Sequence, residues 1–529
     1  MAVSKDRDQD PFTNITIPRF YEEKNIFLTG GTGFIGKVLV EKLLRACPGI
    51  KTIYFLVRPK KGLSYQERIE KIFKLPLFSK LNELYPDAHE KLIPVPGDIT
   101  HRGLGLSDED RLLLQENVDI IIHSAATVRF DEPLRVAVEM NVIAVKEVMQ
   151  LAREIKNLEV FCHISTAYSQ CNKSKDEEIE ERFYPVNVTP EKIIDCLSWM
   201  TDDMVSGFTK SLIGGYPNTY TFTKALAESM LEKEATDLPL LLVRPSIVSA
   251  SVSDPFAGWI DNYNGVSGLI AAVGKGVLRT MHCPQCKNDI VPVDMVTNCI
   301  IAAVWYYGIT RPSKPLICNC TSGNVNPTTF FAMEKICLPI LLSYPYNSIF
   351  RRPNFAFTMN RFIHQYWQVI SHYIPAIIAD GLSILMGSKP RFMNVYRSID
   401  RNLNTLQFFI QNEWRWGNMQ YSRILKAVPE EDKENFDFDM RKIDWPKYYE
   451  NLTLGVKVYL IKDDMSQLPK AIQLQKRYKM VRWLSSTIFI LLAGRFFFLK
   501  SERFRKLWFE ALYAIYRFLQ VFRITSVHV

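Results

Sequence analysis

The stretch that most constrains the fold is KNIFLTGGTGFIGKVLVEKLL, residues 24–44, where a short apolar run meets a glycine-rich turn and then a helical pattern. Three glycines in the turn have the spacing G-x-x-G-x-x-G. A side chain at these positions obstructs the tight turn, the approach of backbone to a pyrophosphate, or the packing of helix on strand. The N–H groups and partial positive charge of a helix N-terminus favour phosphate. The residues expected beside a bound dinucleotide are Gly30, Gly33, Phe34, Ile35 and Gly36.

Residues 24–330 alternate short apolar runs with helical patterns. This alternation is typical of an α/β fold with a Rossmann-like, doubly wound parallel sheet. Two helices are expected over Lys37–Cys47 and Leu134–Lys156. The expected strands cover residues 25–30, 52–58, 91–99, 118–126, 160–166 and 238–246.

The pattern changes after about residue 345, where aromatic residues are dense and helical periods dominate. We therefore expect four parts along the chain. They are an N-terminal extension (1–20), a dinucleotide-binding catalytic domain (21–340), a smaller helical domain (345–465) and a basic, hydrophobic tail (470–529).

The end of the second expected strand indicates which dinucleotide binds. It lacks the Asp or Glu that bonds a ribose 2′-hydroxyl and carries Arg58, Lys60 and Lys61 instead. Cations at this position suit a 2′-phosphate, so NADP(H) is favoured over NAD(H). Further cofactor contacts are expected where the third and fourth strands end. These are Asp98, placed to accept from the adenine amine, with Ile99, and the pair Ser124 and Ala125.

A tyrosine and a lysine four residues apart form the candidate catalytic pair. Among the 23 tyrosines of the chain, only Tyr220 has lysine at the fourth following position, Lys224. On a helix these two residues share a face, so Lys224 can bond the nicotinamide ribose and hold positive charge near the phenol. A nearby cation lowers a phenol's pKa from about 10, which predicts that Tyr220 is a usable proton donor.

The fifth expected strand ends in HISTAY and places two hydroxyl groups, Ser165 and Thr166, at the same edge of the sheet. Either hydroxyl could bond the substrate oxygen from the side opposite the tyrosine. The alternative is that they cap the strand end, and the sequence favours this alternative more for Ser165 than for Thr166.

TGGTGFIG, HISTAY, YTFTK and LVRPS together resemble an extended short-chain dehydrogenase/reductase. Within that superfamily the chain resembles the fatty acyl-CoA reductases over nearly its whole length. The more specific stretches are SAATVRFDEPLR, LVRPSIV, PFAGWIDNYNG, RRPN and DWPKYYENLTLGVKVYL. Ser124 is a departure, since this family usually has Cys there.

The resemblance implies that NADPH reduces a long-chain acyl-CoA to a fatty aldehyde and then to a primary alcohol, as in ether lipid and wax synthesis. Tyr220 and Thr166 would stabilise the oxyanion in both steps. Asn141 matches the position where such reductases hold the helix and a proton-relay water. An Asx turn or a polar contact within the helix is the alternative interpretation of Asn141.

Two other functions fit parts of the sequence. A membrane-attached hydroxysteroid dehydrogenase would share the glycine turn, Tyr220 and Lys224, but not the helical domain or PFAGWIDN. A catalytically silent NADP-binding scaffold would not need the candidate catalytic residues Tyr220, Lys224 and Thr166.

No metal site is expected, because Cys283 and Cys286 supply only half of a structural zinc site.

The positive charge of the chain lies in its tail. Residues 470–529 contain twelve Lys and Arg against two Glu, a net charge of +10, whereas the whole chain has +9. The rest therefore has no nucleic-acid signature, and the tail suits anionic lipid.

Residues 483–499 are expected to span a membrane, and residues 507–522 to form an interfacial helix. The polar N-terminus lacks a signal peptide, so the catalytic part is expected to face the cytosol. The resemblance implies a peroxisomal membrane, with endoplasmic reticulum as the alternative.

Overall fold

The computed structural model describes residues 15–58, 62, 64–284 and 287–525. A seven-stranded parallel sheet forms its centre, in the order β12-β7-β5-β4-β1-β2-β3. The strands are β1 (Asn25–Thr29), β2 (Thr52–Val57), β3 (Leu92–Pro96), β4 (Ile120–His123), β5 (Val160–Ile164), β7 (Leu240–Pro245) and β12 (Leu316–Cys320). The expected doubly wound sheet is confirmed, and all six expected strands lie in it. The seventh strand, β12, was not among those expected.

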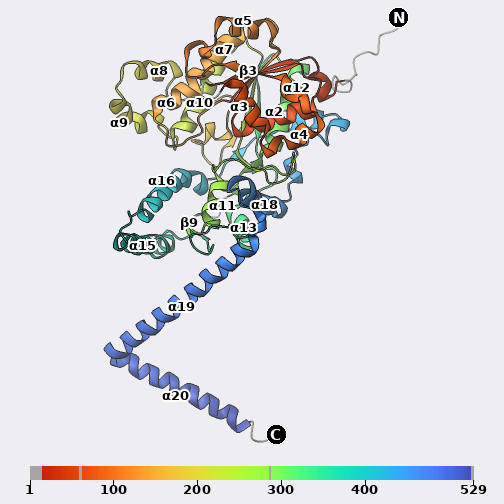
Figure 1. The fold of residues 1–529 in the computed structure, drawn as a ribbon. Helices are drawn as coiled ribbons and strands as arrows, with labels where there is room; N and C mark the ends of the chain where they lie inside the picture. The colour runs from red at the N-terminus through yellow and green to blue at the C-terminus, as the bar shows by residue number, and fades with distance from the viewer. Residues whose placement is uncertain (1–14, 59–61, 63, 285–286, 526–529) are drawn as a thin grey trace, which may run out of the picture.

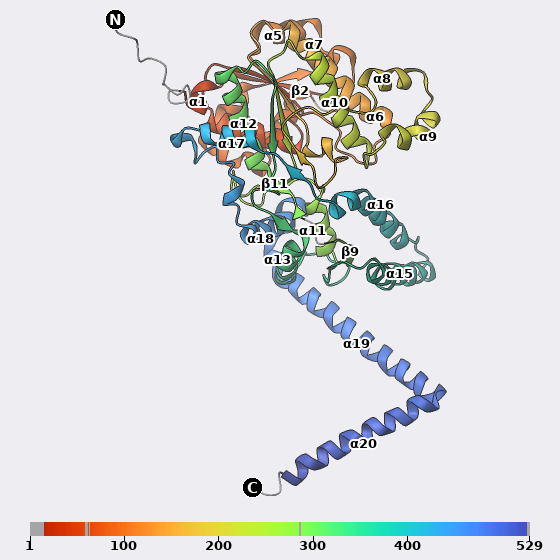
Figure 2. The same ribbon diagram turned by 180° about the vertical axis from the view of Figure 1, so that it is seen from behind.

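Helices cover both faces of this sheet (Figures 1 and 2). Alternate residues of each strand point to opposite faces, so two separate apolar cores form. The first core lies under α2 and α12, and the second lies under α5, α7 and α10. The helices of the region before residue 311 are α1 (Ile17–Phe20), α2 (Phe34–Ala46), α3 (Tyr65–Phe73), α4 (Ser79–Leu84), α5 (Asp108–Asn117), α6 (Leu134–Val138), α7 (Ala144–Glu154), α8 (Pro190–Trp199), α9 (Asp202–Ile213), α10 (Thr219–Glu234), α11 (Val266–Gly274) and α12 (Val293–Thr310).

The helix expected over Leu134–Lys156 is interrupted by one wide turn. α6 and α7 are joined by a π-helical turn at Glu139–Ile143, which contains Asn141. Single π turns inside helices occur frequently at functional sites.

The second half of the chain is mainly helical and packs against the first. Its helices are α13 (Phe330–Ser343), α14 (Arg361–Gln368), α15 (Ile374–Leu385), α16 (Phe392–Gln411), α17 (Met419–Ala427) and α18 (Trp445–Gly455). Small strand pairs join distant segments. They are β9 (Thr280–His282) with β14 (Ala356–Thr358), β6 (Glu178–Ile179) with β15 (Arg415–Trp416), β8 (Ile247–Ser249) with β11 (Ile290–Pro292), and β10 (Lys287–Asn288) with β13 (Thr328–Thr329).

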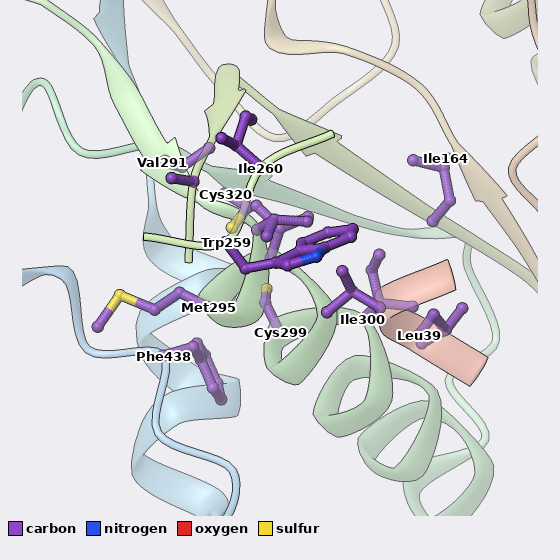
Figure 3. Close-up of a cluster of buried hydrophobic side chains, with 14 of the residues drawn as sticks. Leu39, Ile164, Trp259, Ile260, Val291, Met295, Cys299, Ile300, Cys320 and Phe438 are labelled. Carbon is purple, nitrogen blue, oxygen red and sulfur yellow. The ribbon is translucent and has the colours of Figure 1, made fainter. Parts of the chain in front are cut away.

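Trp259 lies at the junction of these parts, surrounded by side chains from α2, α12 and the C-terminal half (Figure 3). It is 3% exposed and belongs to the PFAGWIDN stretch. Immediately before this stretch, the Asp254 carboxylate accepts hydrogen bonds from Lys42 Nζ and Arg45 Nη2 of α2, each at 2.6 Å. Gly258 lies so close to Asn451 of α18 that a β-carbon there would overlap the Asn451 carbonyl. The stretch therefore connects the dinucleotide-binding helix to the helical region.

Two long helices leave the body at its end: α19 (Leu468–Lys500) and α20 (Glu502–Thr525). α19 extends away from the folded body, and α20 follows it after a sharp bend and runs still further from the body (Figures 1 and 2). By length and composition, Met465–Lys500 is able to cross a membrane, as are Arg361–Leu385 and Val293–Thr310. Val293–Thr310 is α12, of which 83% is buried in the body.

Candidate active site

The glycine turn brings the end of β1 against the end of β4. Gly30 has a φ of +75°, and a β-carbon there would lie 2.5 Å from the Ala125 backbone nitrogen. A β-carbon at Gly36 would overlap the Gly30 carbonyl and the turn itself. Gly33 begins α2 without a side-chain cap, so no side chain covers the first N–H groups of the helix. This cradle, which any β-carbon would fill, fits the pyrophosphate of a dinucleotide.

Phe34 and Ile35 follow the cradle, and their side chains pack on the first core. The Phe34 ring stacks on Trp259, with 5.4 Å between centroids and 19° between planes. Lys37, one turn later, pairs with Asp261 of the same PFAGWIDN stretch. Contact of Phe34 and Ile35 with a cofactor is therefore expected through their backbone rather than their side chains.

The remaining expected cofactor residues lie at the carboxyl ends of β2, β3 and β4. Arg58 is exposed immediately after β2, and its carbonyl accepts a hydrogen bond from Arg68. Lys60 and Lys61 lie outside the described residues. Asp98 Oδ1 accepts from the Thr100 amide at 3.0 Å and from the Thr100 hydroxyl at 2.9 Å, while Ile99 is buried.

Ser124 and Ala125 directly adjoin the glycine turn. The Ser124 amide donates to the Thr29 carbonyl at 3.2 Å, and the Ala125 amide to the Thr29 hydroxyl at 3.3 Å. These bonds fasten the loop after β4 to the end of β1, beside Gly30.

Tyr220 and Lys224 lie on α10, one turn apart, at the same edge of the sheet. Asn218 caps this helix by accepting from the Thr221 amide at 2.9 Å, which fixes where the first turn begins. Lys224 is 3% exposed, and its ammonium group donates to the Ile164 carbonyl at the end of β5, at 2.8 Å. The Tyr220 ring stacks on Phe130, with centroids 5.7 Å apart.

The acidity of Tyr220 differs from the sequence-based expectation. Burial raises the pKa of Tyr220 to about 12, and a hydrogen bond with Thr166 offsets only part of that rise. The expectation that Lys224 lowers this pKa is therefore wrong for the protein without cofactor, because Lys224 donates to Ile164 and burial dominates. The raised pKa keeps the phenol protonated at neutral pH, and the protonated form is the one that can donate.

Lys224 itself is a weaker base than a free lysine. Burial lowers the pKa of Lys224 to about 8, although the negative charge of Glu228 opposes this change. The lysine is thus mostly protonated at neutral pH and loses its charge just above pH 8.

Thr166 and Ser165 have different surroundings. The Thr166 hydroxyl donates to the Pro245 carbonyl at 3.3 Å and accepts from the Tyr168 amide at 3.3 Å, close to Tyr220. The Ser165 hydroxyl instead donates to the Glu228 carboxylate at 2.5 Å. Thr166 is therefore the hydroxyl that lies beside the tyrosine.

Asn141 connects three elements. Its side-chain oxygen accepts from the Thr127 amide at 2.9 Å. Its side-chain nitrogen donates to the Thr127 carbonyl at 3.2 Å and to the Thr223 hydroxyl of α10 at 3.0 Å. The π turn thus holds the loop after β4 and the helix that carries Tyr220.

Several residues of the site were missed by the sequence reasoning. Glu228 forms a buried ion pair with Arg244 of β7, at 2.6 Å. Its place one turn after Lys224 in TYTFTKALAE was the available signal. His123 and His163 stack beneath Lys224 with ring centroids 5.3 Å apart, and burial lowers the pKa of His123 to about 3, so it is neutral.

An apolar cavity of about 270 Å³ was also missed, because distant segments form it. α11 provides Val266, Leu269 and Ala272, and α16 provides Leu403 and Phe409. Phe409 packs against Phe130, with centroids 5.2 Å apart. The aromatic contact Tyr220–Phe130–Phe409 therefore connects the candidate proton donor to the cavity.

In the part of the chain that the structure describes, no group of three His, Cys, Asp or Glu could hold a metal ion. Cys283 is buried, and Cys286 lies outside the described residues.

The fold and this site define a dinucleotide-binding oxidoreductase of the extended short-chain dehydrogenase/reductase type. Solved structures of similar fold include the reductase domain of a nonribosomal peptide synthetase from Mycobacterium tuberculosis. That match has a TM-score of 0.55 and 20% identity, and covers 84% of this chain and 99% of that chain. The terminal R domain from the myxalamid PKS-NRPS pathway matches with a TM-score of 0.53 and 19% identity, and covers 82% and 91%.

Sequence comparison is more specific. The family described as "Male sterility protein" matches residues 28–300 with its NAD-binding part and residues 371–463 with a second part. Fatty acyl-CoA reductase 1 of Mus musculus is 42% identical over 97% of this chain and 99% of its own length. Fatty acyl-CoA reductase 2 of the same species is 43% identical over 96% and 99%. The chain belongs to the fatty acyl-CoA reductase family, and it is an oxidoreductase that uses a nicotinamide cofactor.

The lowered pKa of Lys224 predicts a pH-dependent affinity for the reduced nicotinamide cofactor. If the bound cofactor keeps Lys224 protonated, binding requires proton uptake above pH 8, so the dissociation constant should rise about tenfold from pH 7 to pH 9. Fluorescence titration across this range measures the change. The Lys224→Ala variant should bind the cofactor weakly, and its dissociation constant should not change with pH. The Lys233→Ala variant, altered at an exposed position of the same helix, should show the same pH dependence as the wild type. A flat wild-type profile contradicts the assigned role.

Proposed function

We propose that this protein reduces long-chain fatty acyl-CoA to a primary fatty alcohol with two equivalents of NADPH. The observation that carries the proposal is the contact from Tyr220 through Phe130 to Phe409, because it joins a proton donor to an apolar cavity. A substrate with a reactive carbonyl and a long apolar chain needs both. The similarity to fatty acyl-CoA reductases over 97% of the chain favours the same substrate class.

NADPH, when bound, supplies a hydride in each of two steps. In the first step the thioester carbonyl becomes an oxyanion, the carbon–sulfur bond breaks, and CoA leaves with formation of an aldehyde. In the second step the aldehyde becomes an alkoxide, which Tyr220 protonates. Both steps place negative charge on one oxygen, so hydrogen bonds from Tyr220 and Thr166 serve both.

The other site residues are assigned by their contacts. Lys224 bonds the cofactor ribose from its buried position at the end of β5. Asn141 and Ser165 are positioning residues, since Asn141 holds α10 through Thr223 and Ser165 binds Glu228. The glycine cradle holds the pyrophosphate, and Asp98, Ile99, Ser124 and Ala125 border the adenosine and nicotinamide ends.

The preference for NADPH rests on Arg58, with Lys60 and Lys61 beyond it. Arg58 is exposed at the carboxyl end of β2, where the 2′ position of the adenosine ribose lies in this type of fold. No salt bridge of its guanidinium is found among the described residues.

The chain is proposed to consist of a catalytic domain (21–340), a helical domain (345–465) and a membrane-anchoring tail (470–529). α19 contains the apolar stretch of residues 483–499, and side chains along it, such as Ile490 and Leu491, are more than 60% exposed. A bilayer would cover them. The resemblance to the family supports the peroxisomal membrane with the catalytic domain in the cytosol, and the endoplasmic reticulum is the alternative.

Tyr220→Phe should retain cofactor binding and lose activity by about 10²- to 10⁴-fold, because the ring remains and the proton donor is gone. Alcohol formed from palmitoyl-CoA, measured by mass spectrometry, tests this expectation. Tyr216→Phe is the matched control, since Tyr216 lies in the same YPNTY segment and its buried hydroxyl has no hydrogen-bond partner among the described residues. Near-normal activity of Tyr220→Phe would refute the assignment.

Arg58→Ala should raise the KM for NADPH about ten- to hundredfold and leave the KM for NADH nearly unchanged, because a charge-assisted bond to the 2′-phosphate is lost. Steady-state kinetics with both cofactors measure this difference. Lys51→Ala, at the opposite end of β2, should change neither value. Equal effects on both cofactors would show that Arg58 does not contact the 2′-phosphate.

The tail should make the protein resist extraction from membranes by alkaline carbonate. Leu491→Arg with Leu492→Arg places two charges in the middle of the apolar stretch and should abolish this resistance. Met480→Arg with Val481→Arg adds the same charge before the stretch and should not. Release of the wild-type protein by carbonate would contradict anchoring by α19.

A further inference from the structure

A second apolar surface, apart from the tail, lies on α14 and α15. The segment Arg361–Leu385 is apolar and long enough to cross a membrane, yet only 11% of it is buried. Phe362 is 80% exposed and Leu385 is 84% exposed. We call this surface the α14–α15 apolar face, and it consists of Phe362, Ile363, Tyr366, Trp367, Ile370, Ile377, Ile378, Leu382 and Leu385.

The opposite side of this helical segment is fixed to the protein by hydrogen bonds. The Asp380 carboxylate accepts from the backbone amides of Arg391 at 2.8 Å and of Phe392 and Met393 at 2.9 Å, at the start of α16. Asp400 of α16 accepts from Tyr373 Oη at 2.5 Å. A segment held along one side by α16 cannot cross a bilayer alone, but it can lie on one.

The α14–α15 apolar face lies at the end of the body from which the tail leaves. Figures 1 and 2 both place α15 and the start of α19 at the end opposite α5 and α7. Arg482 of α19, immediately before the apolar stretch, lies within electrostatic range of Arg279. Burial, together with the charges of Arg351, Arg482 and Arg352, lowers the pKa of Arg279 to about 10. The apolar stretch of the tail therefore begins close to the α14–α15 apolar face.

These four arginines, Arg279, Arg351, Arg352 and Arg482, form a basic cluster beside the face. Arg351 donates to the Ser371 carbonyl at 2.8 Å and to Tyr396 Oη at 2.5 Å, so it also holds the α14–α15 segment. Within the described ranges, none of the four forms a salt bridge with a carboxylate. Cations without carboxylate partners at the border of an apolar surface suit an anionic membrane, in which a layer of phosphate groups covers the acyl chains.

We propose that the α14–α15 apolar face is a second membrane contact, which lies flat on the bilayer with its side chains among the acyl chains and the basic cluster at the headgroup phosphates. The body thereby has two attachments, the tail and this face, and a fixed orientation on the membrane. α16, which holds the face, also lines the apolar cavity through Ile399, Leu403 and Leu406. The cavity consequently lies directly behind the membrane surface.

Quenching of tryptophan fluorescence by brominated lipid tests the contact in the full chain and does not depend on activity. Trp367 on α14 is 46% exposed and serves as the probe. The protein is reconstituted in phosphatidylcholine–phosphatidylserine vesicles with brominated acyl chains, and the emission lost in Trp367→Phe is assigned to Trp367. This emission should be strongly quenched. Trp199 on α8 is 62% exposed and is the matched control, whose emission, assigned through Trp199→Phe, should be unaffected.

Unquenched Trp367 in vesicles would overturn the proposal. If light scattering in detergent then gives a dimer, the face is covered by a second copy of the chain. Ile377→Asp with Leu385→Asp should reduce Trp367 quenching while the tail keeps the protein in the vesicles. Undiminished quenching in that variant also counts against the face as the contact. Replacing phosphatidylserine with phosphatidylcholine should reduce quenching, and equal quenching overturns the role of the basic cluster.

Discussion

The arrangement of the candidate catalytic groups depends on one buried ion pair, between Glu228 of α10 and Arg244 of β7. The pair fixes the rotation of α10 against the sheet, so that Tyr220 and Lys224, on the same side of the helix, meet the ends of the strands. Glu228 also accepts from Ser165, which ties the end of β5 to the same carboxylate. Removal of one partner from such a pair costs about 3–5 kcal/mol, because the remaining charge is left buried. An apolar residue in place of Glu228 would leave the Arg244 guanidinium buried without its carboxylate.

The glycine turn, six of the strands and the tyrosine–lysine pair could be predicted because each depends on local spacing. The strand β12 escaped prediction since LICNC is short and contains a buried asparagine, Asn319, whose amide donates to the Gly417 carbonyl at 2.8 Å. Because Gly417 lies almost a hundred residues further along the chain, this contact leaves no hydrophobic periodicity in the sequence around Asn319. The pKa of Tyr220 was misjudged for a similar reason. Spacing places a lysine near the phenol, but it does not reveal that the Ile164 carbonyl takes the ammonium group or that the ring is buried.

The helical region and the dinucleotide-binding region act as one structure around the PFAGWIDN stretch. Asp254 and Asp261 bind three cations of α2, and Trp259 stacks on the first residue of that helix. The same stretch contacts α18 at Gly258. The PFAGWIDN stretch carries part of the resemblance to the family, but the sequence alone does not show what its residues contact. Their contacts show that the helix facing the cofactor is held from outside the sheet, by a loop pressed against the C-terminal half.

Burial of α12 has a consequence for how the protein is made. Its 18 residues have a mean hydropathy of 1.2, sufficient for a membrane span, and they emerge from the ribosome long before the tail. The elements that cover α12 include β12 and α17, the latter ending at Ala427. Until those elements are synthesised, the nascent chain exposes an apolar helix that insertion machinery cannot distinguish from an anchor by hydropathy. α12 and the apolar helix of the tail therefore differ in what covers them in the folded chain, 83% burial against none, and hardly in their own hydropathy, 1.2 against 1.4.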